Sequence, residues 1–324
     1  MGWFSKILRT RTEDWIFAPL GALNPILDPE SWYLNVWLRS MRIVNVRSGL
    51  SKFYGTVHSY ASLLHLNRGR AEFQTVTTPN MLKDQDAKNL DRVISFNHRL
   101  LGPVPYRGQD LEIEIGLFSI KSSELAGPFI DVLERMSNAA GVSYVSSAMP
   151  FVAPLKDGIN LLIGGADSTI LEVGLSTTFE EVRTGTYCVI RAPKGSIDPT
   201  GLRLDTDQRL VDSSGTPITD HPYLVFSIEA SDRRDDWFLV PELAKAYQDL
   251  KEVAEKGQTS EATDAFAVFR RISLTSPELL RADAKRLVDN VGNQIEEVLK
   301  PPRRFLGPPM STRLPDLNKI PLYE

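Results

Sequence analysis

Side chains that usually carry catalysis or bind metals are scarce in this sequence. Its 324 residues include one cysteine, Cys188, and four histidines. No two histidines stand four residues apart, which is the spacing of a helical zinc pair, and no cysteine pair accompanies them. We therefore expect no metal site. Because a single cysteine cannot form an intrachain disulfide, nothing indicates an oxidising compartment, and we expect a cytoplasmic protein that could also lie at a membrane surface.

The motifs of several common enzyme classes are also missing. The chain has no G-x-G-x-x-G or G-x-x-x-x-G-K-[ST] loop for a phosphate and no G-x-S-x-G nucleophile turn. Cys188 lies within an apolar run, residues 186–190, that predicts a strand interior, where a thiol behaves as a small hydrophobic group. We therefore expect a chain that is not an enzyme and that has neither a cofactor nor a small-molecule substrate.

An excess of positive charge is absent as well. The chain has 37 Lys+Arg against 41 Asp+Glu, which gives a formal net charge of -4. A dedicated nucleic-acid-binding protein needs clustered positive charge to displace counterions from phosphates. The charge balance therefore argues against nucleic acid as a partner.

Long apolar runs are rare. The first residues contain no continuous apolar run as long as that of a secretory signal. One stretch, residues 136–155, has 20 residues without a charge, which is roughly the length that spans a bilayer. Small and polar residues interrupt it, and Pro150 and Pro154 would break a helix near its end. Two interpretations stay open: a small-residue helix buried against the protein, or a hairpin that inserts into a membrane.

What the sequence does contain is the composition of a globular protein, with 42% hydrophobic and 24% charged residues. Short runs with a period of two, separated by turn residues, predict strands over much of 31–121 and 166–230. The clearest is 111–117, whose alternation places Glu112 and Glu114 on a solvent-facing side. The run 223–229 is apolar on both faces and predicts a central strand.

Half-buried strands of this kind need a second layer to cover their apolar face, so we predict a β-sandwich. In architecture the region 31–230 resembles sandwich domains of the C2 or immunoglobulin kind. The predicted fold class is α+β: an antiparallel β-sandwich, a helical insertion at 123–165 and a C-terminal helical unit.

Residues 231–300 have the period of helices. Three are predicted, over 241–257, 260–272 and 277–298, and Ser276 and Pro277 have the residue types of a helix cap and first position for the third. Glu278 would then favour the dipole of that helix. The mixed charges of 232–236 predict a surface turn.

An aspartate-rich loop joins two of the strands, over residues 197–218. Asp205, Asp207 and Asp212 could supply hard oxygen ligands to Ca²⁺, although the EF-hand pattern does not fit. The alternative, which we favour, is a solvated hairpin whose aspartates form turns.

Both ends of the chain are apolar and irregular. Residues 1–30 form an arm with aromatic and basic residues, and residues 301–324, six of them proline, form a tail. A disordered tail usually has fewer apolar side chains, so we predict an extended segment that lies in a groove on this protein or on another. The predicted partner-binding side chains are Trp3, Phe4, Ile7, Leu8, Trp15, Phe305, Leu306, Met310, Leu314, Leu317, Ile320 and Tyr323.

The sequence therefore favours a non-enzymatic intracellular interaction or assembly protein. Such a chain would be a subunit of a multi-protein or homo-oligomeric complex and would dock through its N-terminal arm and C-terminal tail. The alternative is a membrane-binding or pore-forming effector that uses residues 136–155 and the amphipathic N-terminal segment.

Overall fold

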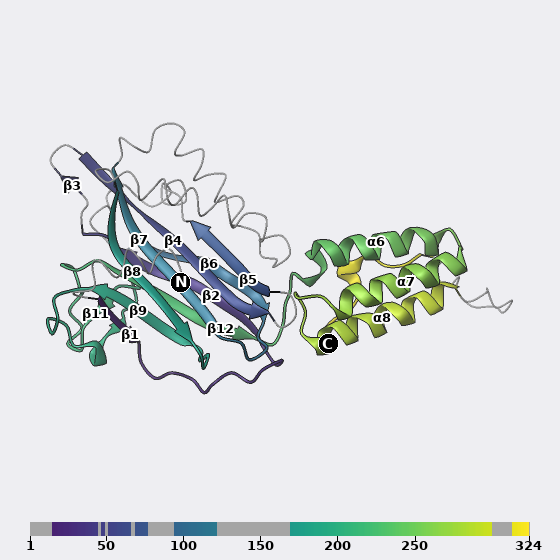
Figure 1. The fold of residues 1–324 in the computed structure, drawn as a ribbon, viewed down its shortest axis with the longest axis horizontal. Coiled ribbons are helices and arrows are strands. Elements are labelled where there is room, and N and C mark those ends of the chain that lie inside the picture. The colour runs from purple at the N-terminus through teal and green to yellow at the C-terminus, as the bar shows by residue number, and fades with distance from the viewer. Residues whose placement is uncertain are drawn as a thin grey trace. The chain divides into compact units, whose positions relative to one another are not determined.

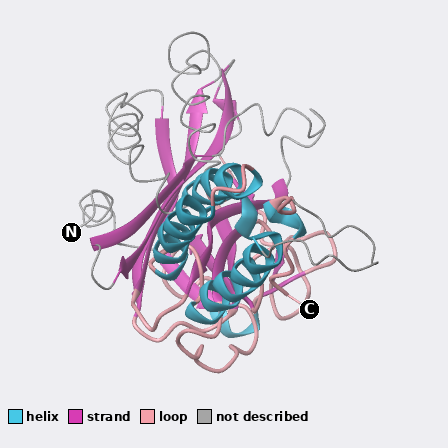
Figure 2. Ribbon diagram, turned by 90° about the vertical axis from the view of Figure 1, so that its right-hand side faces the viewer, coloured by secondary structure: helices cyan, strands magenta, loops and turns pink. Residues whose placement is uncertain are grey.

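A computed structural model describes residues 15–44, 47–48, 51–65, 69–76, 94–121, 169–299 and 313–323. The described chain is mixed α and β, with mostly antiparallel sheets and three α-helices (Figures 1 and 2). It divides into two compact units. The sheet unit comprises residues 1–28, 34–102 and 108–230, and the helical unit comprises residues 29–33, 103–107 and 231–324.

The first sheet has five strands in the order β1-β9-β12-β2-β6. Their bounds are β1 Trp15–Pro19, β9 Gly185–Arg191, β12 Tyr223–Ser231, β2 Tyr33–Arg42 and β6 Ile94–Pro105. Every residue of β12 from Tyr223 to Ile228 is buried. The prediction of a central strand here is confirmed, because an apolar side chain on each face requires cover on both sides.

Cys188 shows how one face of this sheet is covered. Its side chain is fully buried with Ile190 and Val225, and Leu202 and Leu210 from the following loop complete the cluster. Burial raises the pKa of the Cys188 thiol to about 12. The prediction of a buried thiol in a strand interior is therefore confirmed.

The loop that covers this face is a small hairpin. After a short 3₁₀ turn, η4 (Pro199–Gly201), strands β10 (Arg203–Leu204) and β11 (Leu210–Val211) pair antiparallel. Asp205 accepts hydrogen bonds from the backbone N–H of Asp207 and Arg209, both 2.9 Å, and Asp212 accepts from that of Ser214, also 2.9 Å. These aspartates form turns, as favoured from the sequence.

The second sheet has the strand order β3-β4-β7-β8, with β5 also paired to β4. The bounds are β3 Arg47–Ser48, β4 Ser51–His65, β5 Gly69–Val76, β7 Leu111–Lys121 and β8 Thr169–Phe179. The strand predicted at 111–117 is confirmed. The prediction that Glu112 and Glu114 face solvent is wrong for Glu114, which is only 6% exposed. Its carboxylate accepts a hydrogen bond from Ser176 on the paired strand β8.

The helical unit contains α6 (Pro241–Glu255), α7 (Thr259–Leu274) and α8 (Arg281–Leu299), with a 3₁₀ turn, η5 (Trp237–Leu239), before them. The three predicted helices are confirmed. The apolar stripe read from the sequence is the buried face of α8, which includes Ala284, Leu287, Val291 and Ile295. The predicted start at Pro277 is wrong, since α8 begins at Arg281.

No helix in the described ranges is both long enough and apolar enough to cross a membrane. The insertion predicted at 123–165 and the uncharged stretch 136–155 lie outside the described residues.

Candidate functional site

The last described segment of the chain, residues 313–323, lies against two helices of the helical unit. We call it the tail segment; it contains a short 3₁₀ turn, η6 (Leu317–Lys319). From α6, the Tyr247 hydroxyl donates to the carbonyl of Pro315 at 2.7 Å. From α8, Arg286 donates to the carbonyl of Leu322 at 3.0 Å. The segment therefore bridges α6 and α8.

Two more polar contacts extend this bridge. Lys251 on α6 forms an ion pair with Asp316 at 2.9 Å, and the Asn290 side chain on α8 donates to the carbonyl of Pro321. We use "tail-binding surface" for the side chains of α6 and α8 that hold the segment: Tyr247, Lys251, Asp283, Arg286 and Asn290. Each contact fixes one position of an otherwise irregular chain.

Apolar side chains supply the larger part of the tail's attachment. Leu314, Leu317, Ile320 and Leu322 are all buried, at 9% exposure or less. Burying an aliphatic side chain of this size contributes about 2 kcal/mol, as an upper bound for folding. Of the predicted partner-binding residues, Leu314, Leu317 and Ile320 thus lie in the chain's own core, and the segment occupies a surface on this protein.

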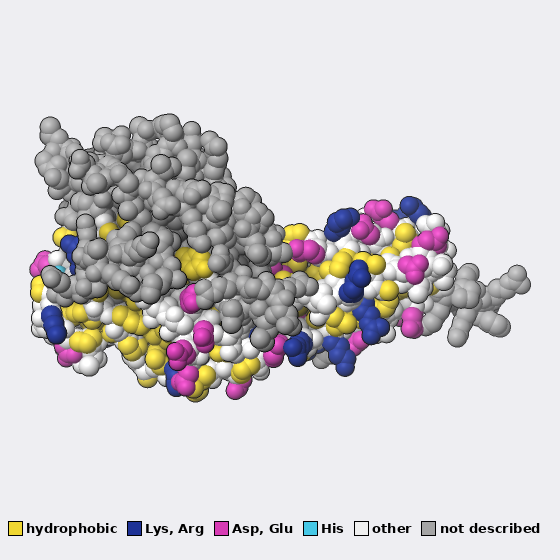
Figure 3. Space-filling view, viewed as in Figure 1, with side chains coloured by type: hydrophobic (Ala, Val, Ile, Leu, Met, Phe, Trp, Pro, Cys, Tyr) yellow, Lys and Arg dark blue, Asp and Glu magenta, His cyan; other side chains and the backbone are white. Residues whose placement is uncertain are grey.

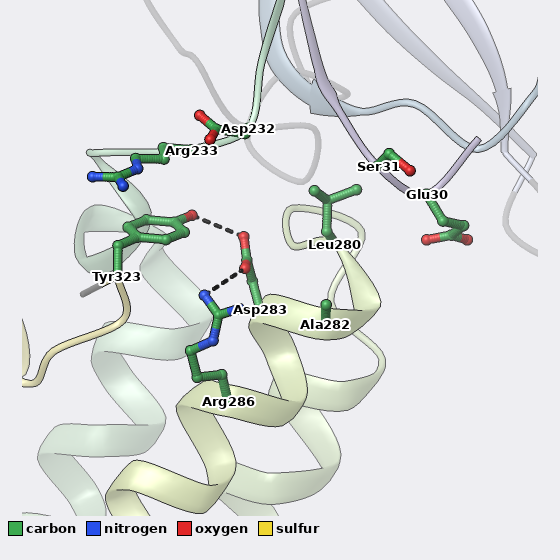
Figure 4. A pocket seen from close by; sticks show the side chains of 9 residues that line it. All are labelled: Glu30, Ser31, Asp232, Arg233, Leu280, Ala282, Asp283, Arg286 and Tyr323. Carbon is green, nitrogen blue, oxygen red and sulfur yellow. Dashed lines mark hydrogen bonds and ion pairs between the residues drawn. The ribbon is translucent and has the colours of Figure 1, made fainter. Parts of the chain in front are cut away.

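The end of the tail segment joins a buried polar network through Tyr323. Its hydroxyl donates to the Asp283 carboxylate at 2.8 Å and accepts from the backbone N–H of Arg234 at 2.9 Å. Tyr33 donates to the same carboxylate oxygen at 2.6 Å and accepts from the backbone N–H of Leu280 at 3.1 Å. Figure 4 shows Tyr323 and Arg286 meeting Asp283 from two sides. One carboxylate thus connects the tail to the rest of the unit.

The protonation states of both tyrosines fit this network. Burial raises the pKa of Tyr33 and of Tyr323 well above the usual value of 10.0, and the nearby Asp283 carboxylate raises both further. The two phenols therefore stay protonated at neutral pH and act as donors.

A second buried network sits next to the first and corrects the sequence interpretation of 232–236 at Arg234, whereas Asp232, Arg233 and Asp235 are exposed, as a surface turn predicts. Arg234 is fully buried, not part of a solvated turn, and pairs with the equally buried Glu278 at 2.8 Å and with Asp236 at 2.9 Å. Its guanidinium also donates to the carbonyl of Pro103 at 3.0 Å. Glu278 thus neutralises Arg234 and lies ahead of α8, which explains why this helix begins later than predicted.

A pocket of about 580 Å³ opens beside Tyr323 (Figure 4). Charges of both signs line it, namely Arg233 and Arg286 and the carboxylates of Glu30, Asp232 and Asp283. Arg286 is held by Asp283 and by the tail, and the Arg233 guanidinium lies 5.7 Å from the centre of the Tyr323 ring. These contacts make the pocket wall a further part of the tail's attachment.

Trp15 is the remaining predicted docking residue within the described ranges. It begins β1, an edge strand of the first sheet, and is half-buried. The other predicted residues lie outside the described ranges: Trp3, Phe4, Ile7, Leu8, Phe305, Leu306 and Met310.

Sequence reasoning missed Tyr33, Arg234, Glu278 and Asp283 as members of this site. Arg234 stands in a run of charges that is typical of a surface turn, and the only local sign of packing is the adjacent apolar run that begins at Trp237. Tyr33 and Asp283 are 250 positions apart, a distance that no local pattern bridges.

Among the residues with described positions, no group of three or more His, Cys, Asp or Glu side chains could hold a metal ion. The calcium interpretation of Asp205, Asp207 and Asp212 therefore gains no support. Comparison of the chain with protein-family models, with curated proteins and with solved structures found no match in any of the three.

Proposed function

We propose that this chain is a non-enzymatic, intracellular interaction or assembly protein whose helical unit binds an extended apolar segment that carries a tyrosine. The observation that carries this proposal is the seating of residues 313–323 along α6 and α8, with four buried anchors and a shared carboxylate. Its body would be a β-sandwich of the C2 or immunoglobulin kind. The single reduced cysteine supports an intracellular compartment.

The chemistry of the tail-binding surface supports recognition rather than mere cover. Extended segments are usually recognised through apolar anchors that give affinity and polar contacts that fix the register. Here the anchors recur every two or three residues, and helix side chains bond the carbonyls of Pro315, Pro321 and Leu322. A segment with another spacing would lose one set of contacts or the other.

Two features of the sheet unit support the proposal that the N-terminal arm docks onto a partner. The arm leads into β1, whose outer edge pairs with no other strand in the described part of the sheet. Phe17, Leu23 and Ile26 follow and are 38–43% exposed. Figure 3 shows hydrophobic side chains gathered on the face that carries β1. An apolar sheet edge is a common place for another chain to add.

The first experiment tests whether the tail segment behaves as a separable ligand. A fluorescent peptide of residues 313–324 is titrated into a chain that lacks these residues, and binding is followed by anisotropy. We expect saturable binding of the wild-type peptide. A matched peptide with Leu314→Asp and Ile320→Asp should not bind, because each aspartate would place a charge where a buried apolar side chain lies.

A second variant keeps this test decisive if the shortened chain does not fold. The full-length chain with Leu314→Asp and Ile320→Asp retains every residue of the helices but releases its own tail, so the wild-type peptide should bind it. If neither folded protein binds the wild-type peptide, the surface is only part of the chain's own core, and the proposed function fails.

A second candidate function is the membrane-binding or pore-forming effector. The observation that favours it is the pairing of β7 with β8, in which Ile120 lies opposite Thr169. The connection that contains the uncharged stretch 136–155 therefore leaves β7 and enters β8 at the same end of these two strands, as an inserting hairpin would require.

Vesicle leakage and co-sedimentation test this candidate. Val142→Asp and Val145→Asp should abolish any leakage, because a carboxylate is costly in the bilayer core. Val268→Asp, at an exposed site on α7, is the matched control and should leave leakage unchanged. Wild-type protein that neither sediments with vesicles nor releases their contents would refute the effector function.

A further inference from the structure

We infer that Asp283 and the backbone N–H of Arg234 form a site that selects the hydroxyl of an unmodified tyrosine. Tyr323 is then the position at which the helical unit distinguishes one extended segment from another. This inference rests on the proposed function and adds to it the chemical group that the tail-binding surface recognises within the segment.

The directions of the hydrogen bonds at the Tyr323 hydroxyl are fixed by its two partners. A backbone N–H can only donate, so the hydroxyl oxygen accepts from Arg234 at 2.9 Å. A carboxylate can only accept, so the hydroxyl proton points to Asp283 Oδ2 at 2.8 Å, the contact drawn in Figure 4. A side chain at this position must therefore accept from one partner and donate to the other at the same time.

A second tyrosine holds the accepting carboxylate in place. Tyr33 donates to the same oxygen, Asp283 Oδ2, at 2.6 Å and accepts from the backbone N–H of Leu280 at 3.1 Å. A carboxylate oxygen has two lone pairs, and the two tyrosine hydroxyls use both. Asp283 and Tyr33 are only 4% and 0% exposed, so bulk water does not replace a missing partner. Tyr33 is therefore a positioning residue, because it orients the acceptor that meets Tyr323.

Phenylalanine has the shape of tyrosine but fails both requirements. It would leave the Arg234 N–H without an acceptor and would remove one donor from the Asp283 carboxylate. A site built to bond a hydroxyl rejects an analogue that lacks it, because the buried polar groups of the site are then left unpaired. The ring alone is therefore not sufficient for attachment at this position.

Phosphotyrosine can accept a hydrogen bond but has no hydroxyl proton to donate. Its phosphate would also place about two negative charges beside the Asp283 carboxylate. Arg286 does not offset this charge, since it already donates to the Leu322 carbonyl and pairs with Asp283 at 3.5 Å. Arg233 lies over the face of the ring, 5.7 Å from its centre. The site therefore favours tyrosine over its phosphorylated form as well.

Peptide affinities test this selection on the full-length chain with Leu314→Asp and Ile320→Asp. Fluorescent peptides of residues 313–324 carry tyrosine, phenylalanine, phosphotyrosine or meta-tyrosine at position 323. The meta-tyrosine peptide is the matched control, because it has the same composition but a displaced hydroxyl. We expect the tyrosine peptide to bind about tenfold more tightly, or more, than each of the other three. Equal or tighter binding of any of those three would overturn the selection while leaving the proposed function intact.

Amide hydrogen exchange, followed by NMR, tests the same contact within the intact chain. Tyr323→Phe should accelerate exchange at the Arg234 amide by about tenfold or more, and should change the Leu280 amide several-fold less. Tyr33→Phe is the reciprocal control and should act mainly on Leu280. If no peptide binds, the proposed function fails and this comparison alone decides the inference. An Arg234 amide that stays equally protected in the Tyr323→Phe chain would refute recognition of the hydroxyl.

Discussion

Arg234 and Glu278 form a fully buried ion pair in the helical unit. Two charges removed from water are costly, and their attraction offsets this cost only when further hydrogen bonds satisfy both groups. The carbonyls of Pro103 and Glu278 and the Asp236 carboxylate supply such bonds to Arg234. The pair therefore contributes to a defined arrangement of η5 and the start of α8 more than to net stability.

Removal of one partner should nevertheless destabilise the unit strongly. Glu278→Gln keeps the shape of the side chain but leaves the Arg234 charge without its buried counterion, which should lower the free energy of unfolding by about 3–5 kcal/mol. Asp249→Asn, in the exposed pair with Lys245, should cost about 0.5 kcal/mol or less. Urea denaturation of both variants checks this, and equal losses would contradict the assignment.

Buried tyrosines make the protein sensitive to alkali. Burial raises the pKa of Tyr223 to about 12 from the usual 10.0, and the pKa values of Tyr33, Tyr247 and Tyr323 are raised in the same direction. The folded state thus favours the neutral phenol. The stability that the buried neutral phenol of Tyr223 contributes is complete below pH 10 and is lost as the pH rises from 10 toward about 12.

Absorbance of tyrosinate and circular dichroism, recorded together between pH 9 and about 12, test this sign. We expect the buried tyrosines to ionise only as the helical and strand signals fall, and Tyr223→Phe should weaken the pH dependence. Ionisation of all tyrosines near pH 10 with the fold intact would show that these hydroxyls are open to solvent.

At the scale of the elements, strands and helices with a complete local pattern were predictable. β7 and β12 follow from the side-chain period of 111–117 and 223–229, and α6 and α7 follow from their apolar stripes. The start of α8 was not predictable in the same way. Ser276 and Pro277 have the residue types of a helix start, but Glu278 is used by Arg234, which lies 44 positions away.

In the candidate site too, features with a local sequence pattern were predictable and those that depend on distant partners were not. The tail's apolar spacing predicted a segment seated in a groove, because that pattern is local. Asp283 as the shared acceptor for Tyr33 and Tyr323 could not be predicted, since it depends on how three distant segments pack. Burial of a charged side chain is decided by such long-range partners.

Gly102, within β6, is the sharpest test of element packing. It has a φ of +101°, and an added Cβ would lie 2.2 Å from the backbone oxygen of Leu34. Gly102→Ala should therefore lower the free energy of unfolding by about 3 kcal/mol, through the left-handed backbone and the clash. Gly195, with φ +81° and nothing within 4 Å, isolates the backbone effect. Gly195→Ala should cost about 1 kcal/mol, and equal values for both would contradict the clash.

For the whole molecule, the two compact units each have a core of their own. Cys188 is buried in the sheet unit, and the tail segment belongs to the helical unit. The thiol therefore reports on one unit while the tail is changed in the other. If the two units unfold separately, loss of the tail should destabilise the helical unit and leave the stability of the sheet unit unchanged.

We predict that deletion of residues 313–324 destabilises the helical unit and leaves Cys188 protected. The deletion removes four buried anchors and the Tyr323 hydroxyl that Arg234 and Asp283 share, so the helical signal should melt at a lower temperature. Labelling of Cys188 with Ellman's reagent below that temperature should stay as slow as in the intact chain, because its thiol remains enclosed by Leu202 and Leu210. Val225→Ala, within the Cys188 cluster, is the reciprocal control and should accelerate labelling with little change in the melting of the helices. Rapid labelling of the shortened chain would show that the sheet core depends on the tail and that the two units unfold as one.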